Sequence, residues 1–121
     1  MRRLSIIVRT IETIVRSPLV KSYNIGITVD SRRRRSQYKN FDPSWPHFLI
    51  IETGLDASRA LNAEREIQEM LKANKRSILF QKYRGDTREK KHSPSLGGIK
   101  QENSRSYDLY ICWGNQEDYK H

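Results

Sequence analysis

The chain has 121 residues, which is enough for one domain with a modest core and excludes two independent cores. Lys and Arg total 23 against 14 Asp and Glu, so the net charge is +9 and a polyanion such as nucleic acid is the leading candidate partner. The single cysteine, Cys112, excludes an intrachain disulfide framework, and the three histidines offer no zinc-ligand spacing beside it. We expect a buried free thiol.

Membrane and secretory classes are not indicated. No apolar run reaches the roughly 20 residues that cross a bilayer, and the N-terminus lacks the apolar core of a signal peptide. We therefore expect an intracellular, cytoplasmic protein with no membrane partner. Apolar residues make up 36% of the chain but lie in short periodic runs, so the sequence predicts one folded domain over residues 1–121.

The first two elements are predicted as strands. Residues 4–15 are rich in Ile, Val and Thr, although the spacing of Arg9 and Glu12 also suits a helix. After the break at Ser17-Pro18, residues 19–29 place apolar side chains in alternation with small or polar ones. Two adjacent strands predict an antiparallel hairpin.

A short helix and a third strand come next. Asp30 and Ser31 offer N-cap side chains for a helix over residues 32–38, and the prolines that follow must end it. Residues 47–53 form a continuous apolar run of strand length. Such a run is typical of a strand covered on both faces.

The best-defined element is a helix that follows Asp56 and runs to about Lys75. Residues 77–83 are predicted to be extended. Residues 84–106 are polar and basic without a period, and we expect them to form a flexible surface loop. Residues 107–113 are rich in aromatic and β-branched residues and predict a final strand.

Glu64 is the first candidate functional residue. The apolar stripe of the long helix consists of Ala57, Ala60, Leu61, Ile67 and Leu71. Glu64 lies in the middle of that stripe, whereas Glu66 and Glu69 point elsewhere and are expected in solvent. An ionised carboxylate that faces the core is costly unless it is paired or binds metal. Two interpretations follow: a ligand of a divalent cation, or a buried salt bridge to an arginine.

Four consecutive arginines open the short helix. Runs of this kind usually form a solvated face or a phosphate-binding patch. The predicted nucleic-acid contacts are Arg32, Arg33, Arg35 and Lys39. Because successive side chains fan around a helix axis, at least one arginine should face the sheet. That arginine could meet Glu64 or a scissile phosphate.

The segment Tyr23-Asn24-Ile25-Gly26-Ile27-Thr28 resembles the second half of the GIY-YIG nuclease signature. In that family an arginine lies eight residues after the glycine, and an aromatic residue often lies four further on, which selects Arg34 and Tyr38 here. The family then has a helix with the pattern A-L-x-x-E, and the same pattern ends at Glu64 in this chain.

The resemblance covers roughly residues 23–80, and it implies an α+β fold with a small antiparallel β-sheet flanked by helices. It also implies an endonuclease that hydrolyses phosphodiester bonds in DNA with Mg²⁺ or Mn²⁺. In that mechanism Glu64 would hold the metal, Arg34 would contact the phosphate and Tyr23 would serve the nucleophilic water. Tyr38 completes the predicted catalytic set.

The first half of the signature, Gly-Ile-Tyr, is missing. Ile11-Glu12-Thr13-Ile14 occupies the stretch about ten residues before Tyr23. In the family that first tyrosine lines the catalytic pocket near the attacking water. An impaired nuclease, a substitute side chain from elsewhere and an inactive protein are the alternatives, with Tyr38 and Tyr83 as candidate substitutes.

Three functions are therefore compatible with the sequence. The first is a metal-dependent endonuclease, and the second is a non-catalytic DNA-binding or adaptor domain that kept the basic face of the fold. The third is a protein-interaction module that binds an acidic surface, with exposed aromatic residues near Trp45 or Trp113 as anchors. Cutting both DNA strands can require a second subunit, so a homodimer is an open alternative.

Overall fold

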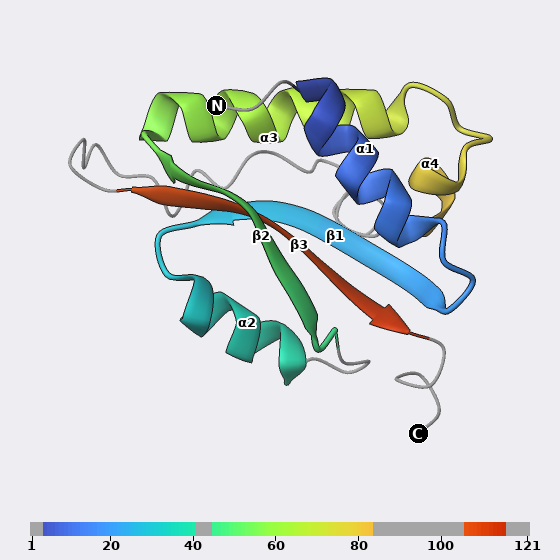
Figure 1. Cartoon of the computed structure of the whole chain (residues 1–121), viewed down its shortest axis with the longest axis horizontal. Coiled ribbons are helices and arrows are strands. Elements are labelled where there is room, and N and C mark those ends of the chain that lie inside the picture. The colour runs from blue at the N-terminus through green and yellow to red at the C-terminus, as the bar shows by residue number, and fades with distance from the viewer. Residues whose placement is uncertain (1–3, 41–44, 84–105, 116–121) are drawn as a thin grey trace.

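The computed structural model describes residues 4–40, 45–83 and 106–115. It is an α+β fold with a three-stranded antiparallel sheet flanked by helices, as predicted (Figure 1). The elements are α1 (Leu4–Val15), β1 (Val20–Thr28), α2 (Ser31–Lys39), β2 (His47–Leu55), α3 (Ala57–Lys72), α4 (Ile78–Lys82) and β3 (Tyr107–Asn115). Apart from Ser106, the predicted basic loop lies outside the described residues. No helix in the described ranges is long and apolar enough to span a membrane.

The last strand, β3, lies in the centre of the sheet. β1 and β2 pair with it from opposite sides, and Ile111 has Ile25 of β1 and Leu49 of β2 as its two neighbours. The predicted hairpin between the first two elements is therefore wrong. The strand that pairs with β1 comes from the far end of the chain, and strand patterns do not specify their partners.

The first predicted strand is also wrong, because this segment forms the helix α1. Its buried residues, Ile7, Ile11 and Val15, recur every four positions and lie on one helical face. Arg16 and Glu12 form an ion pair across one turn, at 2.7 Å. Burial of this stripe against α3 and β1 outweighs the weak strand preference of β-branched residues.

The segment after α3 is helical rather than extended. Ser77 begins α4, because its Oγ accepts a hydrogen bond from the backbone N–H of Phe80 at 3.2 Å. Lys82 then joins α4 to the end of α1 by donating from Nζ to the carbonyl oxygens of Val15 and Ser17, at 2.8 and 3.0 Å. The last carbonyls of a helix have no partner within it, so this cation satisfies one of them.

Both predicted N-caps are confirmed. Asp30 accepts from the N–H of Arg33 at 3.1 Å at the start of α2, and Asp56 accepts from the N–H of Arg59 at 2.8 Å at the start of α3. α3 ends at Lys72, slightly before the predicted end.

The prediction that β2 is covered on both faces is wrong. β2 is an edge strand of the described sheet, and Leu49 and Ile50 are each 41% exposed. Its pairing with β3 shifts register twice, and Gly54 near its end has a φ of 73°. Leu49 and Ile50 are adjacent, and adjacent side chains of a strand point to opposite faces, so neither face of β2 is fully covered at this point.

The two faces of the sheet have separate cores. α1 and α3 cover one face and α2 covers the other (Figure 1). Side chains alternate along a strand, so Tyr23 and Ile25 of β1 join the larger core under α1 and α3, and Asn24 points toward α2. The smaller core contains Tyr38, Trp45, Phe48, Tyr110 and Cys112. Cys112 is the buried free thiol that was predicted.

Close packing of the smaller core depends on Gly26. An added Cβ at this position would lie 2.5 Å from the hydroxyl oxygen and 2.8 Å from Cζ of Tyr110, which is only 2% exposed. We expect Gly26→Ala to lower the free energy of unfolding by about 1–3 kcal/mol, because a filled core resists insertion. Urea denaturation followed by tryptophan fluorescence measures this change. An unchanged midpoint would show that Tyr110 moves aside freely.

Candidate nucleic-acid interface

α2 concentrates the positive charge of the described elements. Its sequence, SRRRRSQYK, has five cations and no acid. Acids and bases balance within α1 and within α3, and the lysines of β1 and α4 are offset by the acids of β2 and β3. The other helices and strands are therefore neutral as a set.

The arginines of α2 are not neutralised by the carboxylates of the described residues. Within residues 4–40, 45–83 and 106–115, none of the four forms an ion pair with a carboxylate. Arg32, Arg33 and Arg35 are exposed, and Arg34 is half-buried. Like charges at neighbouring positions of a helix repel one another, so a ligand that brings negative charge would relieve this repulsion.

An aromatic cluster holds α2 on the sheet, together with the hydrogen bond that Ser31 Oγ donates to Asp108 Oδ2 of β3 at 2.6 Å. Tyr38 is the only buried residue of α2, and its ring stacks on Trp45 with the centroids 5.7 Å apart. Trp45 donates from Nε1 to Ser22 Oγ of β1 at 3.1 Å and from its backbone N–H to the carbonyl of Tyr38 at 3.0 Å. Because Trp45 is itself 4% exposed, its ring is not available as a surface anchor for a protein partner.

Hydrogen bonds fix the Tyr38 hydroxyl beneath α2. It lies 2.9 Å from the hydroxyl of Tyr110 and accepts from Nδ2 of Asn24 at 3.2 Å. Burial raises the pKa of both tyrosines, and the positive charge of Arg34 opposes this rise. Arg34 is half-buried and lies one turn before Tyr38 on α2, so it is the inward-facing arginine that helical geometry predicts.

Tyr23 lies in the larger core, on the other face of the sheet. Its side chain is fully buried, and its hydroxyl donates to the carbonyl of Leu79 at 2.6 Å. Its ring lies 5.4 Å from that of Tyr83, one of the two candidate substitutes for the missing tyrosine. Burial raises the pKa of Tyr23 far above its ordinary value, and the neighbouring Tyr83 adds to the rise. Tyr23 is therefore protonated at neutral pH.

Glu64 is buried in α3, with 1% of its surface exposed, as the helical spacing predicted. Glu66 and Glu69 are exposed, also as predicted. Among the described residues, no group of three or more His, Cys, Asp or Glu side chains is gathered as a metal site. Metal binding by Glu64, alone or with substrate oxygens, stays a prediction.

The sheet lies between α2 and the pair α1 and α3 (Figure 1), and it separates the four predicted catalytic residues into two pairs. Arg34 and Tyr38 lie on the α2 side, and Tyr23 and Glu64 lie on the side covered by α1 and α3. The inward arginine therefore does not meet the buried carboxylate, which was one of the expected alternatives. The catalytic roles of these residues stay predictions.

Asn24 and Tyr110 complete the polar group under α2, and both were missed in the sequence. Strand alternation places Asn24, and not Tyr23, on the same face as Tyr38 once the face covered by α2 is known. Tyr110 lies opposite Gly26 in the pairing of β3 with β1. No local pattern reveals that pairing.

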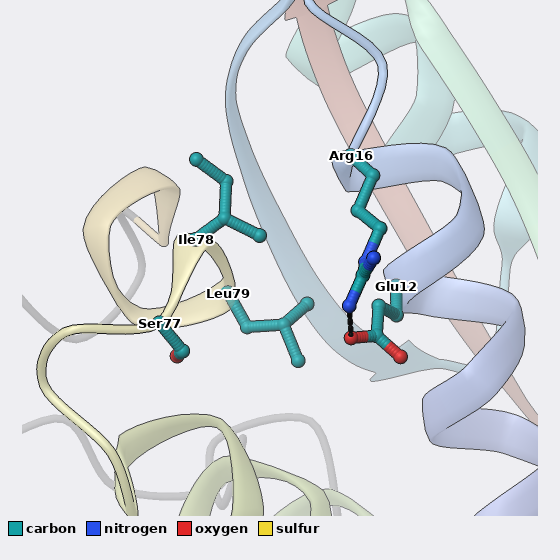
Figure 2. A pocket seen from close by; sticks show the side chains of 5 residues that line it. All are labelled: Glu12, Arg16, Ser77, Ile78 and Leu79. Atoms are coloured by element: carbon teal, nitrogen blue, oxygen red, sulfur yellow. Dashed lines mark hydrogen bonds and ion pairs between the residues drawn. The ribbon is translucent and has the colours of Figure 1, made fainter.

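A hollow on the opposite face lies between α1 and α4 (Figure 2). The ion pair of Arg16 with Glu12 forms one wall, and the side chain of Leu79 points toward it. Its lining residues are Glu12, Arg16, Ser77, Ile78 and Leu79. Because the carboxylate of Glu12 and the guanidinium of Arg16 are paired with each other, we assign no catalytic role to the residues that line this hollow.

No protein family, curated protein or solved structure matches this chain. The GIY-YIG resemblance therefore stays an expectation that rests on the residues carrying it. The function proposed below depends on the charge, burial and hydrogen bonds of the described residues.

Proposed function

We propose that this domain binds DNA through the exposed cations of α2. The observation that carries the proposal is the charge distribution, because α2 has five cations and no acid while the other described elements balance. A phosphate backbone neutralises such a surface and releases counterions, which gives affinity without base reading.

The residue type and its support favour phosphate as the ligand. Guanidinium groups are planar donors that match phosphate oxygens in a two-point contact. The contacts of Tyr38 with Asn24, Tyr110 and Trp45 hold α2 in one orientation, so the arginines lie on a fixed helix rather than on a flexible segment. A preorganised surface binds at a lower entropic cost than a mobile one.

Replacing all four exposed cations of α2 tests the proposal. We expect the variant Arg32→Ala/Arg33→Ala/Arg35→Ala/Lys39→Ala to lower the slope of log K against log [salt] by about 2–4, since each lost phosphate contact removes about 0.9. Fluorescence anisotropy of a labelled duplex at several salt concentrations measures the slope.

A matched variant separates the α2 surface from overall charge. Four exposed cations elsewhere are Arg9, Arg65, Lys75 and Arg76. Their replacement by alanine removes the same charge outside α2 and should change the slope much less. Equal losses in the two variants would place the DNA-binding surface elsewhere.

A metal-dependent endonuclease is the second candidate function. The buried carboxylate of Glu64 supports it, as does the GIY-YIG resemblance. A carboxylate oxygen is a ligand type that Mg²⁺ and Mn²⁺ accept, and Mg²⁺ commonly binds through one or two carboxylates plus phosphate oxygens and water. A homodimer is an expectation of this candidate, and a cytoplasmic location is an expectation for either function. The sheet between Glu64 and Arg34 makes DNA binding through α2 the better supported function.

A further inference from the structure

We infer that α2 contacts a run of consecutive phosphates of one DNA strand through a single flank, formed by Arg32, Arg35 and Lys39. This phosphate-binding flank rests on the proposed DNA-binding function and specifies its geometry. Arg33 and Arg34, which belong to the same run of arginines, have other surroundings and do not take part.

Helical geometry places the three residues of the flank together. Successive residues of an α-helix are about 100° apart, so the positions i, i+3 and i+7 of Arg32, Arg35 and Lys39 fall within about 60° of one another. Tyr38 points to the sheet and fixes the rotation of the helix. The flank is therefore turned about 60–120° from the buried side, at the side of α2.

Arg33 lies on the other side of α2. On the same helical geometry it is about 130° from the centre of the flank. It lines a shallow hollow with Val29, Asp30 and Ser106, and the Asp30 carboxylate accepts from the backbone N–H of Arg33 at 3.1 Å. A carboxylate at this position repels a phosphate, so this hollow is a poor place for the DNA backbone.

Arg34 is also unsuited to a phosphate on the surface. It is half-buried and lies one turn before the buried Tyr38, on the side of α2 that faces the sheet, whereas Arg32 and Arg35 are exposed. The flank therefore consists of the exposed cations on the other side of this buried stripe from Arg33.

The spacing along the flank matches a DNA backbone. With a rise of about 1.5 Å per residue, Arg32 and Arg35 are about 4.5 Å apart along the axis and Lys39 lies about 6 Å further. One strand of B-DNA rises about 3.4 Å per phosphate along its axis and also winds around it, so successive phosphates are further apart than this rise and a flank of about 10.5 Å reaches roughly two or three of them. Contacts of this kind fix position without reading bases.

Four single variants test the flank against a control in the same helix. Arg32→Ala, Arg35→Ala and Lys39→Ala should each lower the salt slope for duplex DNA by about 0.9, and Arg33→Ala should lower it clearly less although it removes the same charge. Fluorescence anisotropy measures the slope, and far-UV circular dichroism confirms that each variant keeps the helical content of the wild type.

The outcomes distinguish this inference from the proposed function. Wild-type protein that does not bind DNA would refute both. Salt-dependent binding in which Arg33→Ala lowers the salt slope as much as Arg35→Ala would contradict the phosphate-binding flank and leave the proposed DNA binding intact. Polyglutamate that binds as tightly as DNA and loses affinity in the same three variants would show that the flank recognises acidic polymers rather than a phosphate run.

Discussion

Tyr38→Ala should lower the free energy of unfolding by about 3–5 kcal/mol and release α2 from the sheet, so that DNA binding is lost in the same variant. The side chain is 6% exposed, stacks on Trp45 and shares hydrogen bonds with Asn24 and Tyr110. Its removal leaves a cavity and deprives those polar groups of a partner. The total free energy of unfolding of a small domain is only about 5–15 kcal/mol, so this loss is a large share of it.

Tyr38→Phe is the matched control for this effect. It keeps the ring on Trp45 and removes only the hydroxyl, so the expected cost is about 1–3 kcal/mol from the buried groups left unsatisfied. α2 should remain docked, and the salt slope of DNA binding should stay close to that of the wild type. Urea denaturation of the three proteins, with anisotropy in parallel, compares stability and binding. A Tyr38→Ala variant within about 1 kcal/mol of the wild type would mean that other contacts hold α2.

Local signals in the sequence predicted the starts of two helices and the inward side chains on them. Asp30 and Asp56 start their helices through side-chain bonds to N–H groups three residues later, which is a short-range effect. The inward position of Glu64, and that of at least one arginine of α2, follows from helical periodicity, which is fixed once a helix is assigned. Each of these depends on residues within one or two turns.

Long-range pairing explains what the sequence did not predict. β3 enters the sheet between β1 and β2, and its pairing with β1 brings Tyr110 over Gly26. In α1 the residue types favoured a strand, but the burial of Ile7 and Ile11 against elements later in the chain decided for a helix. Propensity is weak compared with such tertiary contacts.

The arrangement of the candidate site shows the same limit. Helical geometry requires an inward arginine, but which group it meets depends on the face of the sheet that α2 covers. The sequence left Glu64 and a phosphate as alternatives; α2 lies across the sheet from Glu64, and phosphate contact by Arg34 stays a prediction. The order of the helices in the chain does not say which face of the sheet each one covers, so the neighbours of an inward side chain do not follow from the local pattern.

If the domain is a metal-dependent endonuclease, Glu64→Gln should abolish its nicking of supercoiled plasmid, with a loss of at least about 10³ in rate. The substitution keeps the size of the buried side chain and removes the charge that would hold the cation, and a bound metal is worth several kcal/mol to such a reaction. Glu66→Gln, an exposed change of the same kind in the same helix, is the control and should leave the rate unchanged. Reactions with Mg²⁺, with Mn²⁺ and with chelator measure the effect.

The position of Glu64 behind the sheet makes this experiment decisive between the two functions. DNA affinity through α2 should be the same in Glu64→Gln and in the wild type, because the carboxylate lies on the opposite face from the phosphate-binding flank. Nicking that is lost only in Glu64→Gln would establish a nuclease that does not need the first tyrosine of the signature. Nicking that survives would exclude Glu64 as the metal ligand, and salt-sensitive binding without nicking by the wild type would leave DNA binding as the function of the fold.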